Sequence, residues 1–280
     1  MHLIEKRKYF YIFSSILIIA GIISMFAQGF NLSIDFKGGS LLRYKMDASI
    51  SAAEVRATVE DLGVVKEANI QKSGDEFFIR TMELDQQQTS KITKGLEAKF
   101  KNVTYQSAES VGATIGSELT RNAILSVLVA MALMLVYISF RFEWTFGLAA
   151  VLALFHDVLI VLGLFSIFQW QIDSAFIAAI LTVIGYSIND TIVIFDRVRE
   201  NLRMKKKDDT ATLLNKSIMQ TLNRSINTVL TSLLPLVTLF LFGGSTIKIF
   251  ILALLLGFIF GCYSSICVAS PIYYEIKQRG

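Results

Sequence analysis

Charge is scarce in this chain. Asp, Glu, Lys and Arg together make up 18% of its 280 residues, whereas 53% are hydrophobic. Its mean hydropathy of +0.54 is too high for an ordinary soluble domain. The chain has two cysteines, Cys262 and Cys267, in one apolar run, which excludes a disulfide framework and a cysteine-based metal site. Its two prolines, Pro235 and Pro271, leave long segments free to form helices.

Signals of catalysis are missing from the one long polar segment, residues 30–118. We find no paired carboxylates, no nucleophile beside a base and no phosphate-binding loop there. The segment holds slightly more acidic than basic residues, which argues against nucleic acid as a partner. The sequence therefore predicts a binding or mechanical role, not an enzyme, with no metal and no organic cofactor.

Long apolar runs are what the chain has instead, and several reach the ~20 residues that span a bilayer. The first could be a signal peptide, but it is long for one and no small-residue cleavage site follows, so we interpret it as an uncleaved anchor. We predict a polytopic α-helical membrane protein with six spans: Phe10–Gln28, Arg121–Phe140, Thr145–Phe168, Ser174–Phe195, Ile226–Phe242 and Ile247–Ser270. The predicted domains are span one within 1–29, an extracytoplasmic domain at 30–118, and spans two to six within 119–280.

Basic residues predict the orientation. Six spans place most of the lysines and arginines outside the 30–118 segment on one side of the membrane, and basic loops are cytoplasmic. Both termini are then cytoplasmic. The basic positions used are Lys6, Arg7, Lys8, Arg141, Arg197, Arg199, Arg203, Lys205–Lys207, Lys277 and Arg279.

Residues 30–118 read as strand, helix, strand, strand, helix, strand. Ser51 and Glu54 form a capping box that opens the first helix, and a Ser-Gly-Asp turn separates two strand-like runs. A second amphipathic helix is predicted at Leu84–Phe100. This order matches a ferredoxin-like α+β domain.

Residues 200–222 are polar and basic with a short helical pattern, TLLNKSIMQTL. We predict a cytoplasmic amphipathic segment along the membrane surface, in contact with the lipid bilayer. A solvated loop attracted to anionic lipid is the alternative that the sequence leaves open.

Asp190 is the most informative residue. It lies in the run IAAILTVIGYSINDTIVIF, which has no other charge. A carboxylate in hydrocarbon costs several kcal/mol unless it is paired, hydrated or protonated, so such a residue is by default a functional-site candidate. A frayed cytoplasmic helix end is the alternative. Asp190 precedes the first cation by two helical turns, which favours the buried interpretation.

Other polar residues occupy the spans. His156 and Asp157 lie in the third span and Asn189 beside Asp190 in the fourth. Arg224 opens a polar stripe in the fifth and is a candidate partner for Asp190, because the two charges can compensate each other in low dielectric. Arg224 could instead be a snorkelling anchor, and His156 could be one half of a helix-end polar pair.

The run from Gly185 to Asn201, GYSINDTIVIFDRVREN, resembles the signature of the SecF family of Sec translocase accessory subunits, in the RND superfamily. It contains the cytoplasmic-end motif Asp196-Arg197. A DFxGG-type element with Asp35, Gly38 and Gly39 follows the first span. The sequence LNRSINT resembles the start of the family's fifth span, and FHD resembles the family's third-span motif. The resemblance covers essentially the whole chain. One departure is Ala113 after Val111-Gly112, where the family usually has proline, which puts the local hinge geometry in doubt.

The resemblance implies a partner and a role. A SecF-like chain pairs with SecD to form a twelve-span unit, of which this chain is the RND-type half. The unit works beside the SecYEG channel, with YajC as a possible further partner, and is thought to use the proton-motive force to draw preproteins outward. Asp190 matches the family's intramembrane carboxylate and Arg224 its basic partner, so protons are the coupling ion.

Our hypothesis is a relay through Asp190, Arg224, Asn189, His156 and Asp157, with movement transmitted at the Gly38-Gly39 junction. Two rival functions stay open. One is a half-transporter for a small molecule or lipid. The other is a structural subunit that stabilises its partner and does not titrate.

Overall fold

The computed structural model describes residues 2–65, 68–204 and 209–279. Its contacts divide the chain into two compact units, which are described one at a time. The helical unit comprises Met1–Asn31 and Ile124–Gly280, and the α+β unit is Leu32–Ala123. The sequence predicted limits of 30 and 118 for the second of these.

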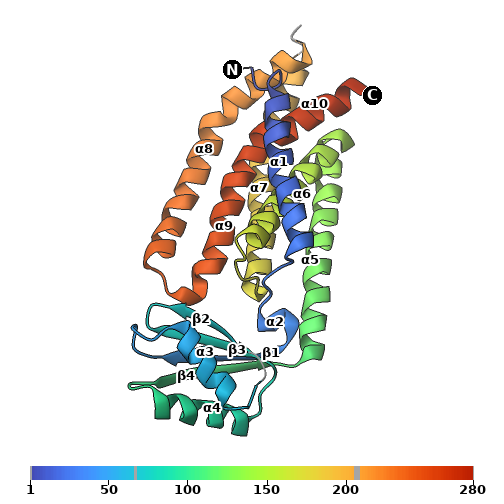
Figure 1. Cartoon of the computed structure of the whole chain (residues 1–280). Coiled ribbons are helices and arrows are strands. Elements are labelled where there is room, and N and C mark those ends of the chain that lie inside the picture. The colour runs from blue at the N-terminus through green and yellow to red at the C-terminus, as the bar shows by residue number, and fades with distance from the viewer. Residues whose placement is uncertain (1, 66–67, 205–208, 280) are drawn as a thin grey trace. The chain divides into compact units, whose positions relative to one another are not determined.

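Six helices in the described part of the chain are long and apolar enough to cross a membrane, one for each predicted span. The sixth crossing is built from α9, η1 and α10 in succession. Figure 1 labels α9 and α10. The helices are α1 (Arg7–Ala27), α5 (Ala113–Arg141), α6 (Trp144–Ile167), α7 (Ser174–Arg203), α8 (Thr210–Phe242), α9 (Ser245–Ser264), η1 (Ser265–Ala269) and α10 (Ser270–Arg279).

The core of the helical unit is formed by α6, α7 and α9, whose apolar windows are at least half buried. Helices α1, α5 and α8 are mostly exposed and present apolar side chains outward, as helices that face lipid do. Glycines bring α1 close to α6: a Cβ added to Gly21 would lie 2.7 Å from the Cα of Gly163. Small residues at such crossings let helix backbones approach closely in membranes.

The described residues of the predicted amphipathic segment 200–222 are helical, but they belong to the ends of two longer helices. α7 continues to Arg203, and α8 runs without interruption from Thr210 through the fifth span. Asn215 Oδ1 accepts hydrogen bonds from the backbone N–H groups of Leu3 and Ile4, at 2.8 and 3.0 Å. The apolar side of this part of α8, including Leu214, is buried within the protein. Contact of the segment with the lipid bilayer stays a prediction. Lys205–Lys207 lie outside the described residues.

The sixth crossing contains a π-helical segment, η1, which the sequence did not predict. It carries Ser265, Cys267, Val268 and Ala269 as buried residues. Such segments occur mostly as single-turn insertions within α-helices, frequently at functional sites.

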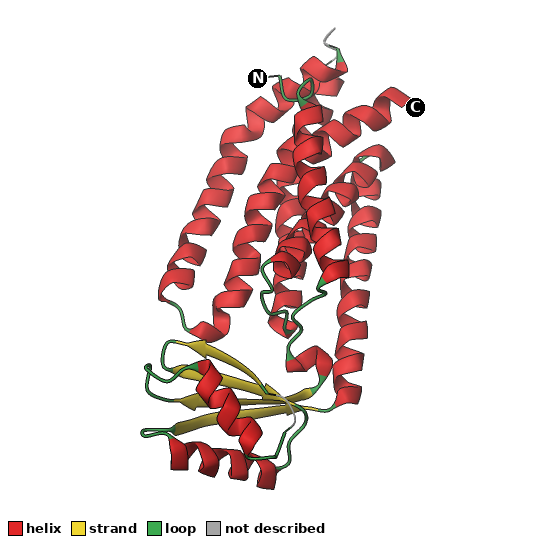
Figure 2. Cartoon of the chain, viewed as in Figure 1, coloured by secondary structure: helices red, strands yellow, loops and turns green. Residues whose placement is uncertain are grey.

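The α+β unit has the predicted element order, with one additional short helix. Its elements are α2 (Ile34–Lys37), β1 (Gly39–Lys45), α3 (Ala52–Asp61), β2 (Asn69–Ser73), β3 (Glu76–Thr81), α4 (Gln86–Lys99) and β4 (Thr104–Val111). Figure 2 shows the strands as one sheet; its order is β2-β3-β1-β4, with every neighbouring pair antiparallel. Tyr44, Phe77, Ile79, Ile92 and Leu96 are fully buried in its core.

Capping residues begin both long helices of this unit. Ser51 and Glu54 form the predicted box on α3, and Asp85 with Gln88 forms a second on α4. Each box satisfies backbone N–H groups that the first helical turn leaves unpaired.

Glycine is required where the chain enters this unit's sheet. Gly38 and Gly39 have φ values of 74° and 122°, which side-chain-bearing residues rarely adopt. A Cβ on Gly39 would lie 2.4 Å from the Thr81 carbonyl oxygen, and one on Gly38 3.0 Å from the Cα of Ala113. The segment by which the chain enters the α+β unit therefore packs on the segment by which it leaves. The second of these is the start of α5, which begins at Ala113 without a proline at that position.

Candidate functional site

Two carboxylates are buried in the helical unit: Asp157 of α6 is 1% exposed and Asp190 of α7 is 7% exposed. Each lies within a spanning helix, where an uncompensated charge is expensive. Their surroundings differ, and the difference defines the site.

Asp157 is held by donors from three helices. Ser187 Oγ of α7 and Ser264 Oγ of α9 both donate to Asp157 Oδ2, at 2.8 and 2.7 Å. His156 Nδ1 lies 2.9 Å from Oδ1. Both carboxylate oxygens are therefore satisfied, as the burial of such a group requires.

His156 extends this network to α1. Its Nε2 lies 2.8 Å from Ser14 Oγ, which lies 3.2 Å from the hydroxyl of Tyr263 on α9. The Tyr263 hydroxyl donates to the Phe10 carbonyl oxygen at 3.0 Å. The chain of contacts returns to α1, so helices α1, α6, α7 and α9 share one buried polar network.

Counting the hydrogens available to this series of hydrogen bonds indicates how the His156–Asp157 pair is protonated. The Tyr263 hydroxyl has one hydrogen, which the Phe10 carbonyl takes, so Ser14 must donate to Tyr263. Ser14 then has no hydrogen for His156, and Nε2 must be the donor. Every contact is filled when one further proton lies between His156 Nδ1 and Asp157 Oδ1. The histidine–aspartate pair is then neutral overall, which favours its burial.

Asp190 has no comparable set of partners. Its Oδ2 is buried without a hydrogen-bond partner, and so is Ser225 Oγ on α8. Within the described parts of the chain Asp190 forms no ion pair, and the predicted partner Arg224 is an exposed residue of α8. Arg224 nevertheless lies close enough for its charge to act on Asp190, so the two residues are neighbours without a direct ion pair, and their pairing stays a prediction.

Hydroxyl groups connect the surroundings of the two carboxylates. Thr191 Oγ1, next to Asp190, lies 2.8 Å from Ser265 Oγ in η1. Both hydroxyl oxygens also lie 3.3 Å from the Ser187 carbonyl oxygen, which accepts from at most one of them because the other hydrogen lies in the Thr191–Ser265 contact. Ser187 thus serves both regions, with its side chain on Asp157 and its carbonyl on the η1 contact.

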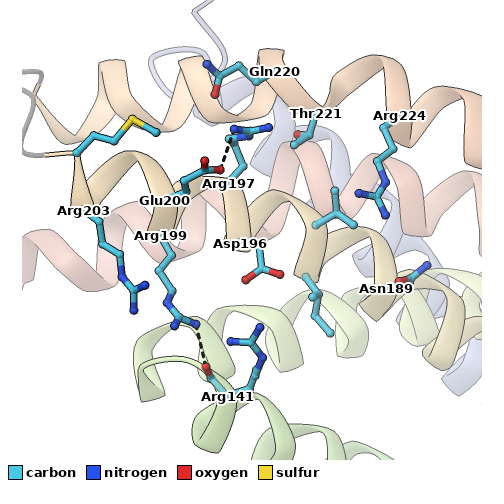
Figure 3. Close-up of a pocket in the computed structure, with 13 residues that line it drawn as sticks. Arg141, Asn189, Asp196, Arg197, Arg199, Glu200, Arg203, Gln220, Thr221 and Arg224 are labelled. Carbon is cyan, nitrogen blue, oxygen red and sulfur yellow. Dashed lines mark hydrogen bonds and ion pairs between the residues drawn. The ribbon is translucent and has the colours of Figure 1, made fainter.

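The remaining predicted residues of the helical unit meet in a pocket of about 790 Å³ between the end of α5, α7 and α8. Asn189, Asp196, Arg197 and Arg224 all line it (Figure 3). Arg197 pairs with Glu200 at 2.8 Å, within the pocket. Asp35, Gly38 and Gly39 belong to the α+β unit and take no part in this pocket.

The partners of His156 and Asp157 are the residues that sequence reasoning missed. Ser14, Tyr263 and Ser264 are ordinary residues of apolar spans, and nothing in their spacing relates them to the third span. Ser187 was recognised as polar within its span but not as a partner of Asp157. A small polar residue in each apolar run was the available signal.

The fold and the site together define a multi-pass helical membrane protein with a buried polar network. The sequence matches the C-terminal family of the protein export membrane proteins SecD and SecF over residues 91–279. It also matches the SecD/SecF GG motif over residues 23–50, which include Gly38 and Gly39. The chain therefore belongs to the SecD/SecF family.

Individual relatives agree with this assignment. Protein translocase subunit SecF of Sebaldella termitidis is 40% identical, covering 99% of this chain and 92% of the relative. Protein translocase subunit SecDF of Thermus thermophilus is 39% identical, covering 100% of this chain but 40% of the relative. These names support an accessory role in protein export.

Solved structures give the same answer. The crystal structure of Thermus SecDF, described as a translocon-associated membrane protein, superposes with a TM-score of 0.94 at 38% identity, over 100% of this chain and 39% of that one. A SecDF structure described as the super-membrane-facing form superposes with a TM-score of 0.75 at the same identity and coverage. The two solved forms therefore differ in the arrangement of the region that corresponds to this chain.

Proposed function

We propose that this chain is a SecF-like subunit that assists Sec-dependent export of preproteins across the bacterial cytoplasmic membrane. The support is the family assignment together with full-length relatives that carry the SecF name. The chain acts without an organic cofactor, and protons are its coupling ion.

The orientation follows from charge. Both termini and the basic ends of α5 and α7 lie on the cytoplasmic side, because loops rich in lysine and arginine stay inside. The α+β unit then lies outside the membrane. Its strand order β2-β3-β1-β4, with helices after the first and third strands, supports a ferredoxin-like domain.

One observation carries the proton role: Asp190 is 7% exposed inside a spanning helix, and its Oδ2 has no partner among the described residues. A buried oxygen without a donor favours the neutral, protonated acid, whereas a charged one needs a cation or water. Asp190 is therefore positioned to exchange a proton when its surroundings change.

The second carboxylate has a different part in the relay. The neutral His156–Asp157 pair connects α1, α6, α7 and α9, and Ser187 links it to the helix that carries Asp190. Protonation of Asp190 from outside removes its charge and permits a second packing of α7 and α8. Release to the cytoplasm, past Asn189 and Arg224, resets the helices.

The driving force is sufficient for such a switch. Moving one charge across a membrane yields about 2.3 kcal/mol per 100 mV. Two states of a switching protein typically differ by a few kcal/mol, so one proton per cycle is enough to shift their populations.

SecD is the proposed partner. Relatives named SecDF hold the region that matches this chain within one longer polypeptide, and this chain covers 40% of the Thermus protein. The SecYEG channel, the translocating preprotein and YajC complete the proposed assembly, which works beside the channel in the lipid bilayer.

The test is proton-driven export into inverted membrane vesicles. Asp190→Asn keeps the volume and hydrogen bonding of the side chain but cannot ionise, so it should assemble at wild-type levels and lose stimulation by the proton-motive force. Glu143→Gln is the matched control, because Glu143 is an exposed carboxylate at the start of α6. Its stimulation should be unchanged.

Normal stimulation in Asp190→Asn vesicles would refute the proton role and leave a structural subunit. Export of a small molecule or lipid by the reconstituted complex, without any effect on preproteins, would favour the half-transporter. The family assignment to protein export argues against that second result.

A further inference from the structure

The pocket at the end of α7 carries a strong positive charge. Five arginines line it against two carboxylates, those of Asp196 and Glu200. The arginines are Arg141 of α5, Arg197, Arg199 and Arg203 of α7, and Arg224 of α8. Of these five arginines only Arg197 forms an ion pair with a described residue, so the other four guanidinium groups have no carboxylate in direct contact there.

Like charges are held together at one corner of this pocket. Arg199 Nη1 donates to the Arg141 carbonyl oxygen at 3.1 Å. The guanidinium carbons of Arg141 and Arg199 lie 5.4 and 5.6 Å from the centroid of the same ring, that of Phe142. Arg203 projects from α7 toward the same corner (Figure 3). Guanidinium groups gathered in this way match the oxygens of a phosphate.

The pocket also has an apolar side. Ile192, Val193 and Met204 contribute to its lining. Phe140, which precedes Arg141, is 89% exposed and continues an exposed apolar face of α5. A ligand with one anionic group and hydrocarbon chains would satisfy both parts.

The pocket lies at the ends of spanning helices, a position that fits the membrane–water interface. Arg141 ends one spanning helix and Trp144 begins the next, with its side chain 64% exposed. Tryptophan and arginine at helix ends are typical of the membrane–water interface, where headgroups lie. Basic pockets between spanning helices on the cytoplasmic side bind anionic headgroups.

The geometry points to a binding site for the phosphate headgroup of an anionic membrane phospholipid, held by Arg141, Arg199 and Arg203. The acyl chains lie along α5 and the apolar lining of the pocket. The Asp196 carboxylate also faces the pocket, which favours a singly charged phosphodiester over a phosphate of higher charge. This site goes beyond the proposed proton role and uses residues other than Asp190.

Binding of fluorescent phosphatidylglycerol to the detergent-solubilised full chain tests the site, with fluorescent phosphatidylcholine for comparison. The test variant is Arg141→Gln with Arg199→Gln. The matched control is Lys8→Gln with Lys216→Gln, which removes two exposed positive charges that do not line the pocket. Wild type and control should prefer phosphatidylglycerol. The test variant should bind it about 25-fold more weakly, at roughly fivefold for each basic residue.

Further variants keep the test independent of folding and of proton coupling. Arg199→Lys keeps the charge and should retain much of the binding. If the double variant fails to fold by gel filtration and circular dichroism, Arg203→Gln, at an exposed position, should give the fivefold loss alone. Asp190→Asn should bind phosphatidylglycerol like wild type, so failure of the proton role leaves the lipid site standing.

Several results would overturn the lipid site. Equal binding of the two lipids by wild type would do so, as would an unchanged preference in the arginine variant. Displacement of phosphatidylglycerol by millimolar glycerol phosphate would assign the pocket to a soluble phosphate ester. Loss of phosphatidylglycerol binding in the complex with a partner subunit would assign the arginines to a protein interface.

Discussion

Asp157 and Asp190 lie in neighbouring helices of the same core, yet their surroundings differ in kind. Three donors from three helices surround Asp157. Asp190 has a buried oxygen with no donor among the described residues. The first arrangement resembles a structural polar network, fully satisfied and shared between elements, whereas the second is incomplete within one chain.

The comparison shows that depth alone does not identify a titrating group. A satisfied carboxylate stabilises the packing of its neighbours, and changing its charge would disturb all of them. An unsatisfied carboxylate can change its protonation at lower cost to the surrounding fold. The four predictions below test this contrast, from the largest expected effect to the smallest.

Removing each carboxylate in turn should give the largest difference in stability between the two sites. Asp157→Ala removes the acceptor shared by His156 Nδ1, Ser187 Oγ and Ser264 Oγ, of which Ser264 Oγ alone has another acceptor among the described residues, the Gly261 carbonyl oxygen at 3.1 Å. The change should destabilise the helical unit by about 3–5 kcal/mol. Asp190→Ala should cost at most about 1 kcal/mol, since its one neighbouring side-chain donor, Ser225, forms no full hydrogen bond with it. Denaturant unfolding of the full chain in detergent micelles measures both. Equal losses would remove the contrast.

Two serines offer a smaller version of the same comparison. Ser264→Ala removes one donor to Asp157 and should cost about 1–3 kcal/mol. Ser225→Ala removes a buried hydroxyl that has no partner near Asp190, and should be neutral or slightly stabilising. Thermal unfolding of the two variants side by side is the measurement. A large loss for Ser225→Ala would show that this hydroxyl is bonded to Asp190.

A double-mutant cycle tests whether Asp190 depends on Arg224 within this chain. Arg224 is exposed and forms no ion pair with Asp190, so Arg224→Met should change the free energy of unfolding by no more than about 0.5 kcal/mol. Combining it with Asp190→Asn should give additive effects in the isolated chain. A coupling above about 1 kcal/mol would establish the pair predicted from the sequence.

The smallest effect concerns an exposed carboxylate, Asp75 of the α+β unit. Lys45 Nζ lies 3.0 Å from Asp75 Oδ2, and this hydrogen bond lowers the pKa of Asp75 below its usual value. The folded-state pKa is the lower one, so the contribution to stability is present above about pH 3.9 and is lost as the pH falls further. An NMR titration of Asp75 should give a low midpoint, and Lys45→Gln should raise it. An unchanged midpoint would show that the bond is not formed in solution.

The spanning helices and the order of the α+β unit could be predicted because their signals are local. Runs of about twenty apolar residues and the Ser51–Glu54 capping box are each visible within one segment. The start of α4 was placed two residues early, because its cap is the Asp85–Gln88 box and not an apolar residue.

The site was predictable only in part. Asp190 and His156–Asp157 stand out as charge in apolar runs, but their partners depend on how each helix is rotated about its own axis. Ser264 and Ser14 are separated from Asp157 by long stretches of chain, and only the packed bundle brings them together. The long α8 was missed for a related reason, because its polar half is stabilised by Asn215 and the distant N-terminus.

The π-helical segment Ser265–Ala269 determines in which direction, around the helix axis, the side chains that follow it point. One residue advances an α-helix by about 100°, and a π turn accommodates one residue more than an α turn. Ser264, just before the segment, contacts Asp157 of α6, and Ser265, its first residue, contacts Thr191 of α7. Tyr273 follows the segment and stacks on Phe146, with ring centroids 4.1 Å apart. A regular α-helix would turn Tyr273 about a quarter turn away from that ring. Interconversion of η1 between π and α geometry would thus rotate the C-terminal helix about its axis while the serines stayed in place.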